Sequence, residues 1–367
     1  MKRCTKCILP DNYPGITFNE EGICNYCISD LKKKERNYLG DNALKEKITQ
    51  FLKNNEDRNK NYDCVLGFSG GRDSTYLLYY LVKKLNMKVL AYNVDNGFTP
   101  EQTKINMINA TNILNVKLVV DKIDYLEKCF KHHIISWMHK PSLAMIETFC
   151  IGCRYGQNKG LPKFAKKNKI PIYIMGATLS EKANYKINML KLKPDSKGNI
   201  QIIIGTLLHL AKNPKTFCNV NCLSMQIKEY FSYFLFFNKI KKKIGIKSNI
   251  LRLDPFVTYK RWEEKEINAI IQNELKWKKY QGIESTWRGD CDIALIKLYM
   301  YKQILGFNDK DEGFSYLIRD NQINRDEALE RIKTEGDVPK EIIKEIFDKY
   351  GLNFSDFEVA LKKCEKV

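Results

Sequence analysis

Two cysteine pairs near the start of the chain have the spacing of a structural metal site. Cys4 and Cys7 form one C-x2-C pair, Cys24 and Cys27 form another, and sixteen residues separate the pairs. Each pair can sit on a tight turn and offer two thiolates to one tetrahedral ion, so the pattern indicates zinc. A module this small has little core, and the metal would supply its folding energy. The alternative is four reduced cysteines that simply pack.

A glycine-rich segment, Ser69 to Ser74, follows a short apolar run and precedes a stretch with helical apolar spacing. Two consecutive glycines let the backbone turn tightly and approach a ligand. The amides at the start of the helix favour an anion, so we expect a phosphate or pyrophosphate there. The lysine that a Walker A loop requires is missing. The alternative is a chance glycine turn.

A further C-x2-C pair, Cys150 and Cys153, has no matching second pair nearby, although Cys218 and Cys222 lie downstream. With Cys222 the pair would make a second metal or cluster site, since three thiolates with one open position suit an iron–sulfur cluster. Buried thiols that only pack are the alternative.

The elements that must position these residues alternate between strand and helix. Apolar runs at 64–68, 88–94, 116–120 and 170–175 predict strands, with helical patterns between them. This alternation predicts an α/β fold with a doubly wound parallel sheet, in which ligands bind at the carboxyl ends of the strands. Ser69, Asp95 and Gly176 fall at such ends and are expected to converge on one nucleotide.

The rest of the sequence predicts three regions: a zinc module at 1–35, a nucleotide-binding α/β domain at 36–260 with an insertion near 184–250, and a helical region at 261–367. The aromatic and then basic segment 226–245 predicts either a buried helix with a solvated basic end or contact with a membrane surface or partner. No stretch is long and apolar enough to span a membrane, and the start lacks the apolar core of a signal peptide. We therefore expect a cytoplasmic protein.

The formal net charge is +19, from 62 basic and 43 acidic residues. Such a surface attracts anions, including nucleic acid, nucleotides and anionic lipid, but charge alone does not choose among them. A lysine-rich genome composition explains the excess equally well.

Several motifs carry a family resemblance. Ser-Gly-Gly-Arg-Asp-Ser at 69–74 resembles the PP-loop signature of the ATP pyrophosphatase superfamily, whose members cleave ATP between the α- and β-phosphates. The cysteine pairs, the polar segment 280–285 and the segment 317–329 are similar to motifs of the N-acetyl sugar amidotransferases of lipopolysaccharide and other surface-polysaccharide biosynthesis. The region 184–260 shows no such similarity.

The resemblance implies that ATP adenylates the amide oxygen of an N-acetyl sugar, and that ammonia then displaces AMP to give an acetamidino sugar. It implies ATP, Mg²⁺ and Zn²⁺, and places adenosine near Asn93 to Asn96. Glu284 is a candidate substrate contact. Because no glutaminase nucleophile is evident, a separate glutaminase subunit is expected to supply ammonia. The implied loop roles are pyrophosphate binding by Ser69, Gly70, Gly71 and Ser74, charge neutralisation by Arg72, and Mg²⁺ binding by Asp73.

Two other classes compete with this interpretation. PP-loop tRNA thiolases also adenylate a carbonyl oxygen but deliver sulfur; some carry zinc modules and a three-cysteine cluster, which Cys150, Cys153 and Cys222 would match, and the charge would suit tRNA. A non-enzymatic zinc-binding module leaves the segment 69–74 unexplained. The sugar amidotransferase is favoured, because the C-terminal motif resembles that family.

Overall fold

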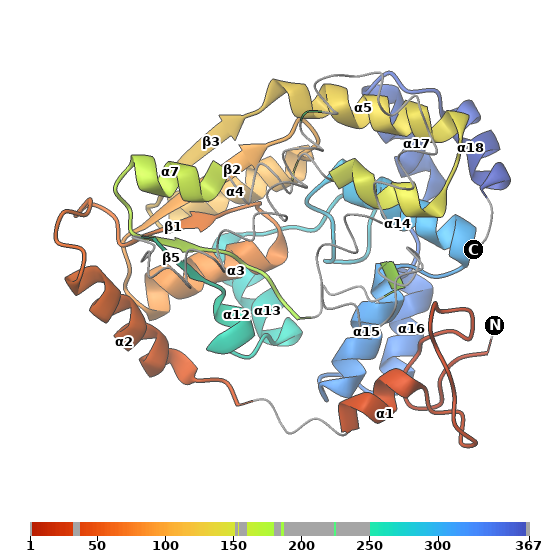
Figure 1. Cartoon of the computed structure of the whole chain (residues 1–367), viewed down its shortest axis with the longest axis horizontal. Helices are drawn as coiled ribbons and strands as arrows, with labels where there is room; N and C mark the ends of the chain where they lie inside the picture. Colours follow the sequence, from red (N-terminus) through yellow and green to blue (C-terminus); the bar gives the residue numbers. More distant parts are fainter. Residues whose placement is uncertain are drawn as a thin grey trace.

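The computed structural model describes residues 2–31, 37–150, 153, 160–179, 185–186, 224 and 250–364. Its centre is a five-stranded, fully parallel sheet with the order β3-β2-β1-β4-β5 (Figure 1). This confirms the expected α/β class. The strands are β1 (Cys64–Gly67), β2 (Val89–Asp95), β3 (Lys117–Lys122), β4 (Ile172–Ile174) and β5 (Leu251–Leu253).

Both faces of the central strand β1 are covered, which explains its continuous apolar sequence. Leu66 packs into a core with helices α3 (Arg72–Tyr79), α4 (Glu101–Ile113) and α13 (Glu264–Leu275). Its neighbour Val65 points to the opposite face and packs with Leu161 of α7 (Leu161–Lys167). Successive side chains of a strand alternate between faces, so one apolar run serves two cores.

Further helices lie next to the strands of this sheet in the chain. Helix α2 (Gly40–Lys53) adds Leu44 and Ile48 to the core beneath β1. A π-helical turn, η1 (Tyr80–Lys84), extends α3, and the short helix α12 (Pro255–Thr258) follows β5.

The C-terminal region is helical, as expected, and lies beside the sheet (Figure 1). One part of it shares a core with α5 and η2, which come from the middle of the chain. Another part joins the core on the sheet, through Phe314, Leu317, Ala328 and Ile332. The elements are α5 (Asp124–His139), η2 (Leu143–Cys150), α14 (Asp292–Leu305), α15 (Asp309–Arg319), α16 (Arg325–Glu335), α17 (Lys340–Lys349) and α18 (Phe354–Lys363).

The N-terminal module, with its helix α1 (Asn25–Leu31), packs on this helical region and not on the sheet (Figure 1). Arg3 Nη1 lies 2.8 Å from Asp311 Oδ1, and the Tyr13 hydroxyl donates to Glu312 Oε2 at 2.6 Å. Its cysteines belong to the same core as α14, α17 and α18. Both ends of the described chain therefore build one hydrophobic core.

Two expectations about segments stay predictions. The insertion near 184–250 and the aromatic-basic segment 226–245 lie almost wholly outside the described residues, and the three domain boundaries remain untested. None of the helices that the structure describes combines the length and the apolar character needed to cross a membrane.

Candidate functional site

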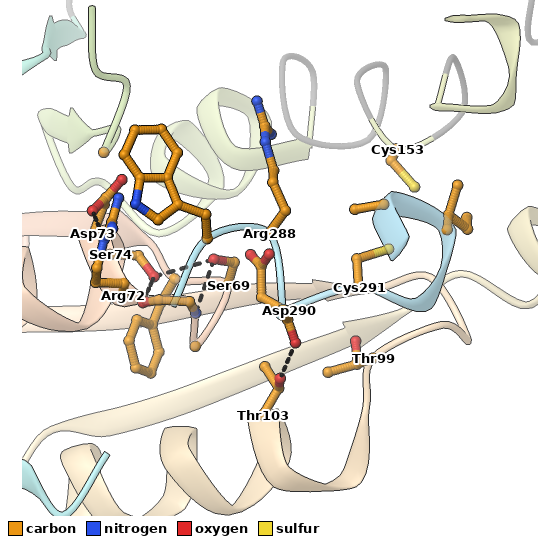
Figure 2. A pocket seen from close by; sticks show the side chains of 18 of the residues that line it. Ser69, Arg72, Asp73, Ser74, Thr99, Thr103, Cys153, Arg288, Asp290 and Cys291 are labelled. Carbon is orange, nitrogen blue, oxygen red and sulfur yellow. Dashed lines mark hydrogen bonds and ion pairs between the residues drawn. The ribbon is translucent and has the colours of Figure 1, made fainter. Parts of the chain in front are cut away.

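A cavity of about 580 Å³ lies between the carboxyl ends of β1, β2 and β4 and the first helices of the C-terminal region (Figure 2). Its volume is typical of small-molecule sites, and its place is where parallel sheets bind ligands. The segment 67–74 lines one side, and residues 286–298 with Asp309 line the other.

The glycine-rich segment forms a compact loop at the N-terminus of α3. Ser69 Oγ and Ser74 Oγ lie 3.1 Å apart, the Gly71 amide donates to Ser69 Oγ at 3.2 Å, and Ser74 Oγ lies 3.1 Å from the Gly71 carbonyl oxygen. Ser69 and Ser74 lie side by side at the cavity (Figure 2), and Gly70 and Gly71 also line it. Hydroxyls and helix-start amides at one point form an anion site.

The two glycines are required by close packing. Gly70 has φ +77°, and a Cβ there would lie 2.5 Å from Met107 Cγ and 2.9 Å from the Thr103 carbonyl oxygen. A Cβ on Gly71 would lie 2.7 Å from Asp290 Oδ2. The loop is thus held between α4 and the polar turn 285–291, which contributes Asp290 to the cavity wall.

Arg72, expected to neutralise pyrophosphate, is buried and already paired. Its guanidinium lies 2.9 Å from Asp73 Oδ1 and 3.0 Å from Glu264 Oε1, and it stacks at 4.7 Å from the ring centres of both Trp262 and Trp287. Two carboxylates offset its charge and two indoles shield it. The geometry therefore favours a different role, in which Arg72 positions the loop.

Asp73, the expected Mg²⁺ ligand, uses one carboxylate oxygen for this cluster. Its Oδ1 also accepts from Trp262 Nε1 at 3.0 Å. Within the described residues no hydrogen bond reaches Oδ2, and Asp73 and Asp290 both line the cavity. One or two carboxylates beside a phosphate site fit the oxygen ligands that Mg²⁺ prefers.

Of the other expected nucleotide contacts, two line the cavity and one does not. Asn93 lines the cavity and donates from Nδ2 to the Phe68 carbonyl at 2.8 Å, while its buried Oδ1 has no partner in the described part of the chain. Gly176 also lines the cavity, beside Ser74. Asp95 does not; its Oδ1 accepts from the Gly97 amide at 2.9 Å and shapes the turn after β2.

Glu284 is the expected contact that the structure places elsewhere. Its side chain is 67% exposed and pairs with Lys279, and it is not among the residues that line the cavity. The residues that follow it, 286–290, do reach the cavity, and among them Arg288 and Asp290 contribute charged side chains to its wall. Arg288 has φ +60°, a left-handed conformation that is uncommon for a side chain of this size. The run of polar residues before a helix was the sequence signal for this turn.

Glu264 anchors the wall from beneath. Arg331 Nη1 lies 2.7 Å from Glu264 Oε2, and Trp287 Nε1 donates to Oε1. Burial disfavours the charged carboxylate, but hydrogen bonds from Arg331 and the charges of Arg72 and Arg331 outweigh it, so the pKa of Glu264 is lowered. The cluster holds the turn 285–291 over the loop.

The far end of the cavity carries a network of paired charges. Lys297 Nζ lies 2.8 Å from Glu147 Oε1, and Lys186 Nζ lies 2.8 Å from Asp309 Oδ2 and 3.4 Å from Glu147 Oε1. Burial raises the pKa of Asp309, but the positive charge of Lys186 overcomes this effect and leaves it lowered. These side chains make this end of the cavity polar.

Three cysteines line the same cavity: Cys150, Cys153 and Cys291. Burial raises the pKa of the Cys291 thiol, and the nearby thiols of Cys153 and Cys150 raise it further. Cys222, the expected third member of the set, lies outside the described residues. Cys291 is a single cysteine that belongs to no sequence motif. Nothing in its local sequence marks it as a partner of the pair.

The four N-terminal cysteines come together as expected and could hold a metal ion. The four sulfur atoms lie within 4.8 Å of one another, and all four residues are buried. Backbone amides of Lys6, Cys7 and Cys24 donate to Cys4 Sγ at 3.2–3.4 Å. Hydrogen bonds from Cys24 and Cys27 lower the pKa of Cys7. This donor set fits a tetrahedral ion such as zinc.

A comparison with protein families confirms the expected similarity of the C-terminal region to proteins of lipopolysaccharide biosynthesis. Residues 274–366 match the family described as "LPS biosynthesis protein WbpG-like, C-terminal domain". The matched segment supplies the cavity wall from Trp277 to Asp309.

Three further proteins are similar to this chain. An uncharacterized protein of Methanocaldococcus jannaschii, MJ1599, is 30% identical over 127 residues, which are 34% of this chain and 44% of that protein. A U34-tRNA thiolase, NcsA, from Methanococcus maripaludis with its [4Fe-4S] cluster has a TM-score of 0.34 and 16% identity, over 91% of this chain and 90% of the other. An NH3-dependent NAD synthetase from Campylobacter jejuni has a TM-score of 0.28 and 16% identity, over 64% of this chain and 93% of the other. The function proposed below does not depend on these two structures.

Proposed function

We propose that this chain, whose C-terminal region is WbpG-like, is an ATP-dependent amidotransferase. It would adenylate the N-acetyl group of a sugar and replace its oxygen with ammonia-derived nitrogen, giving an acetamidino sugar for surface-polysaccharide biosynthesis. The single observation that carries the proposal is the composition of the cavity. A loop suited to pyrophosphate forms one wall, and the domain shared with lipopolysaccharide-biosynthesis proteins forms the other.

The loop is suited to the first half-reaction. An amide oxygen is a poor leaving group, so attack of that oxygen on the α-phosphorus of ATP, with loss of pyrophosphate, converts it to one that departs as AMP. The hydroxyls of Ser69 and Ser74 and the Gly71 amide would hold the pyrophosphate being released. Mg²⁺, held by Asp73 and Asp290, would offset the charge of the phosphates. Asn93, at the end of β2, lies where adenosine is expected.

The far end of the cavity would receive the sugar. The ion pairs of Lys186 and Lys297 with Glu147 and Asp309 offer both donors and acceptors to sugar hydroxyls. Ammonia would come from a separate glutaminase subunit. In the second half-reaction this ammonia would attack the carbon that bears the adenylated oxygen, and AMP would leave. The resulting nitrogen carries the positive charge of an amidine.

The test is AMP release from ATP with Mg²⁺ and ammonium, using a panel of N-acetylated nucleotide sugars. Sugars with a hydroxyl in place of the acetamido group serve as negative controls. We expect AMP only with N-acetylated sugars, and a product mass that corresponds to replacement of O by NH. Ser74→Ala should slow AMP release by on the order of 10²-fold, whereas Ser355→Ala, a serine on the exposed side of α18, should not. Efficient use of glutamine by the pure chain would contradict the separate glutaminase.

One observation favours a second candidate, sulfur transfer to tRNA after adenylation. Three cysteines share the cavity with the loop, and an oxygen-for-nitrogen exchange needs no thiol. AMP release that depends on bulk tRNA and not on any sugar would favour this second function.

A further inference from the structure

The structure assigns a second metal centre to the cavity: we infer that Cys150, Cys153 and Cys291 together hold a [4Fe–4S] cluster with one iron facing the cavity. This inference concerns a cofactor and stands independently of the reaction proposed above. It replaces Cys222 of the sequence analysis by Cys291 as the third ligand.

The first argument is convergence. The three cysteines come from the end of η2, the residue three positions beyond it, and the residue directly before α14, yet all three line one cavity. Asn96 Nδ2 lies 3.0 Å from Cys153 Sγ and 3.8 Å from Cys291 Sγ, so these two sulfurs flank one amide nitrogen. In Figure 2 both sulfurs point into the same space.

The second argument concerns size. A single tetrahedral ion needs its sulfur ligands as close as those of the N-terminal module, all within 4.8 Å of one another. Among the described residues only that module meets this condition, so at least two of the three cavity sulfurs lie more than 4.8 Å apart. A [4Fe–4S] cluster binds each thiolate at a different iron, so it bridges more widely spaced thiolates than one ion does. The spread favours a cluster over a second zinc ion.

The third argument concerns charge. Three thiolates around a cluster leave a net negative group, which needs hydrogen-bond donors or cations nearby. Lys297 Nζ lies 3.7 Å from Cys150 Sγ, and Asn96 Nδ2 reaches the other two sulfurs. Both side chains line the cavity. Donors next to the sulfurs are the interactions that stabilise such clusters and set their potentials.

The fourth argument concerns the open position. Three protein thiolates leave one iron of the cluster without a protein ligand among the described residues. Because the three cysteines line a cavity that also contains the loop 69–74, this iron would face that cavity.

The experiment is metal analysis of the full-length chain, purified without oxygen and reconstituted with ferrous iron and sulfide. We expect about four irons per chain besides about one zinc, a broad visible absorption band, and an electron paramagnetic resonance signal after reduction. Cys150→Ser, Cys153→Ser and Cys291→Ser should each lose most of the iron and the visible band while keeping the zinc. Retained zinc and an unchanged circular dichroism spectrum identify variants that still fold.

The matched control is Cys364→Ser, a buried cysteine at the end of α18 that does not line the cavity. It should keep the iron. Loss of iron in Cys222→Ser, with iron retained in Cys291→Ser, would overturn the assignment of the third ligand. A wild-type chain that binds zinc alone after reconstitution, or that has a Cys150–Cys153 disulfide when purified without oxygen, would overturn the cluster itself. None of these outcomes depends on a turnover assay. Failure of the cluster assignment is therefore distinguishable from failure of the proposed reaction.

Discussion

The N-terminal module and the cavity wall both gather cysteines, but they do so by different means. In the module, backbone amides of the two C-x2-C turns donate to sulfur, and all four thiols are buried and close together. At the cavity, side chains of Asn96 and Lys297 approach the sulfurs, and the three thiols are half-buried. Four enclosed thiols, the closed set, suit a structural ion. Three thiols at a cavity, the open set, suit a metal centre that reacts with a substrate. Both sites offer thiols as ligands, so the difference between them lies in how deeply the thiols are buried.

The largest effect is expected for Cys24→Ser in the closed set. Loss of one thiolate should abolish zinc binding, which supplies on the order of 10 kcal/mol to comparable small modules. Since the module shares its core with α14, α17 and α18, the helical region should lose stability too. Metal content and thermal unfolding measure both effects. The open set sharpens the comparison: Cys153→Ser, at a half-buried residue, should keep the zinc and nearly the wild-type Tm.

A large but smaller effect is expected for Glu264→Gln, beneath the cavity wall. The change leaves the guanidinium groups of Arg72 and Arg331 without their shared carboxylate, and breaking a buried pair costs about 3–5 kcal/mol. The neighbouring Glu263→Gln is the control, because the Glu263 side chain is 47% exposed. Equal unfolding free energies for the two variants would contradict the anchoring role of Glu264.

The same residue predicts a pH dependence. The pKa of Glu264 is lowered in the folded chain. When the pH falls towards the pKa of an ordinary glutamate, the folded state therefore binds fewer protons than the unfolded state. The stabilisation is complete above the unfolded pKa, about 4.3, and is lost as pH falls through the folded pKa. The stability difference between wild type and Glu264→Gln should therefore shrink on acidification below about pH 4, as followed by denaturant unfolding.

A moderate effect is expected from packing at the phosphate loop. Gly70→Ala must adopt a positive φ and clashes with Met107 and Thr103, which together cost roughly 2–4 kcal/mol. Gly176→Ala is the matched comparison, since its Cβ would meet Ser74 only at 3.7 Å, an ordinary contact. We expect a lower Tm for the first variant alone. A similar loss in both would mean that the loop is not held as tightly as described.

The smallest effect is expected for Glu284→Gln. This side chain is exposed and does not line the cavity, so unfolding free energy should change by less than about 0.5 kcal/mol. Turnover should also be unchanged. A marked rise in KM for the sugar would restore the substrate contact that the sequence resemblance implied.

The local features of this chain were readable from sequence because their signals are contiguous. The predicted strand at 88–94 is observed as β2, and the loop at 69–74 lies between β1 and α3. The C-x2-C pairs also carry their spacing within one short segment. In each case the residues that define the element are neighbours in the chain.

The features that the sequence does not reveal depend on residues far apart in the chain. Nothing near Arg72 in the sequence indicates that Trp262 and Trp287 enclose its guanidinium. Nothing near Cys291 indicates that it lines the same cavity as Cys153, because that placement requires the sheet and α14 to be in place. Strand β5 was also missed, since it follows the long region that shows no motif. Tertiary packing decides such positions, and local propensity does not record it.

The contacts between the N-terminal module and the C-terminal helices have a consequence for synthesis. Arg3 and Asp311 are 308 positions apart, and Arg325 Nε donates to the carbonyl oxygens of Cys4 and Cys7. On the ribosome the module emerges well before the surface that covers its apolar side. The nascent chain must therefore carry that side uncovered until the later helices are made, which is the interval in which chaperone binding or early metal loading would protect it.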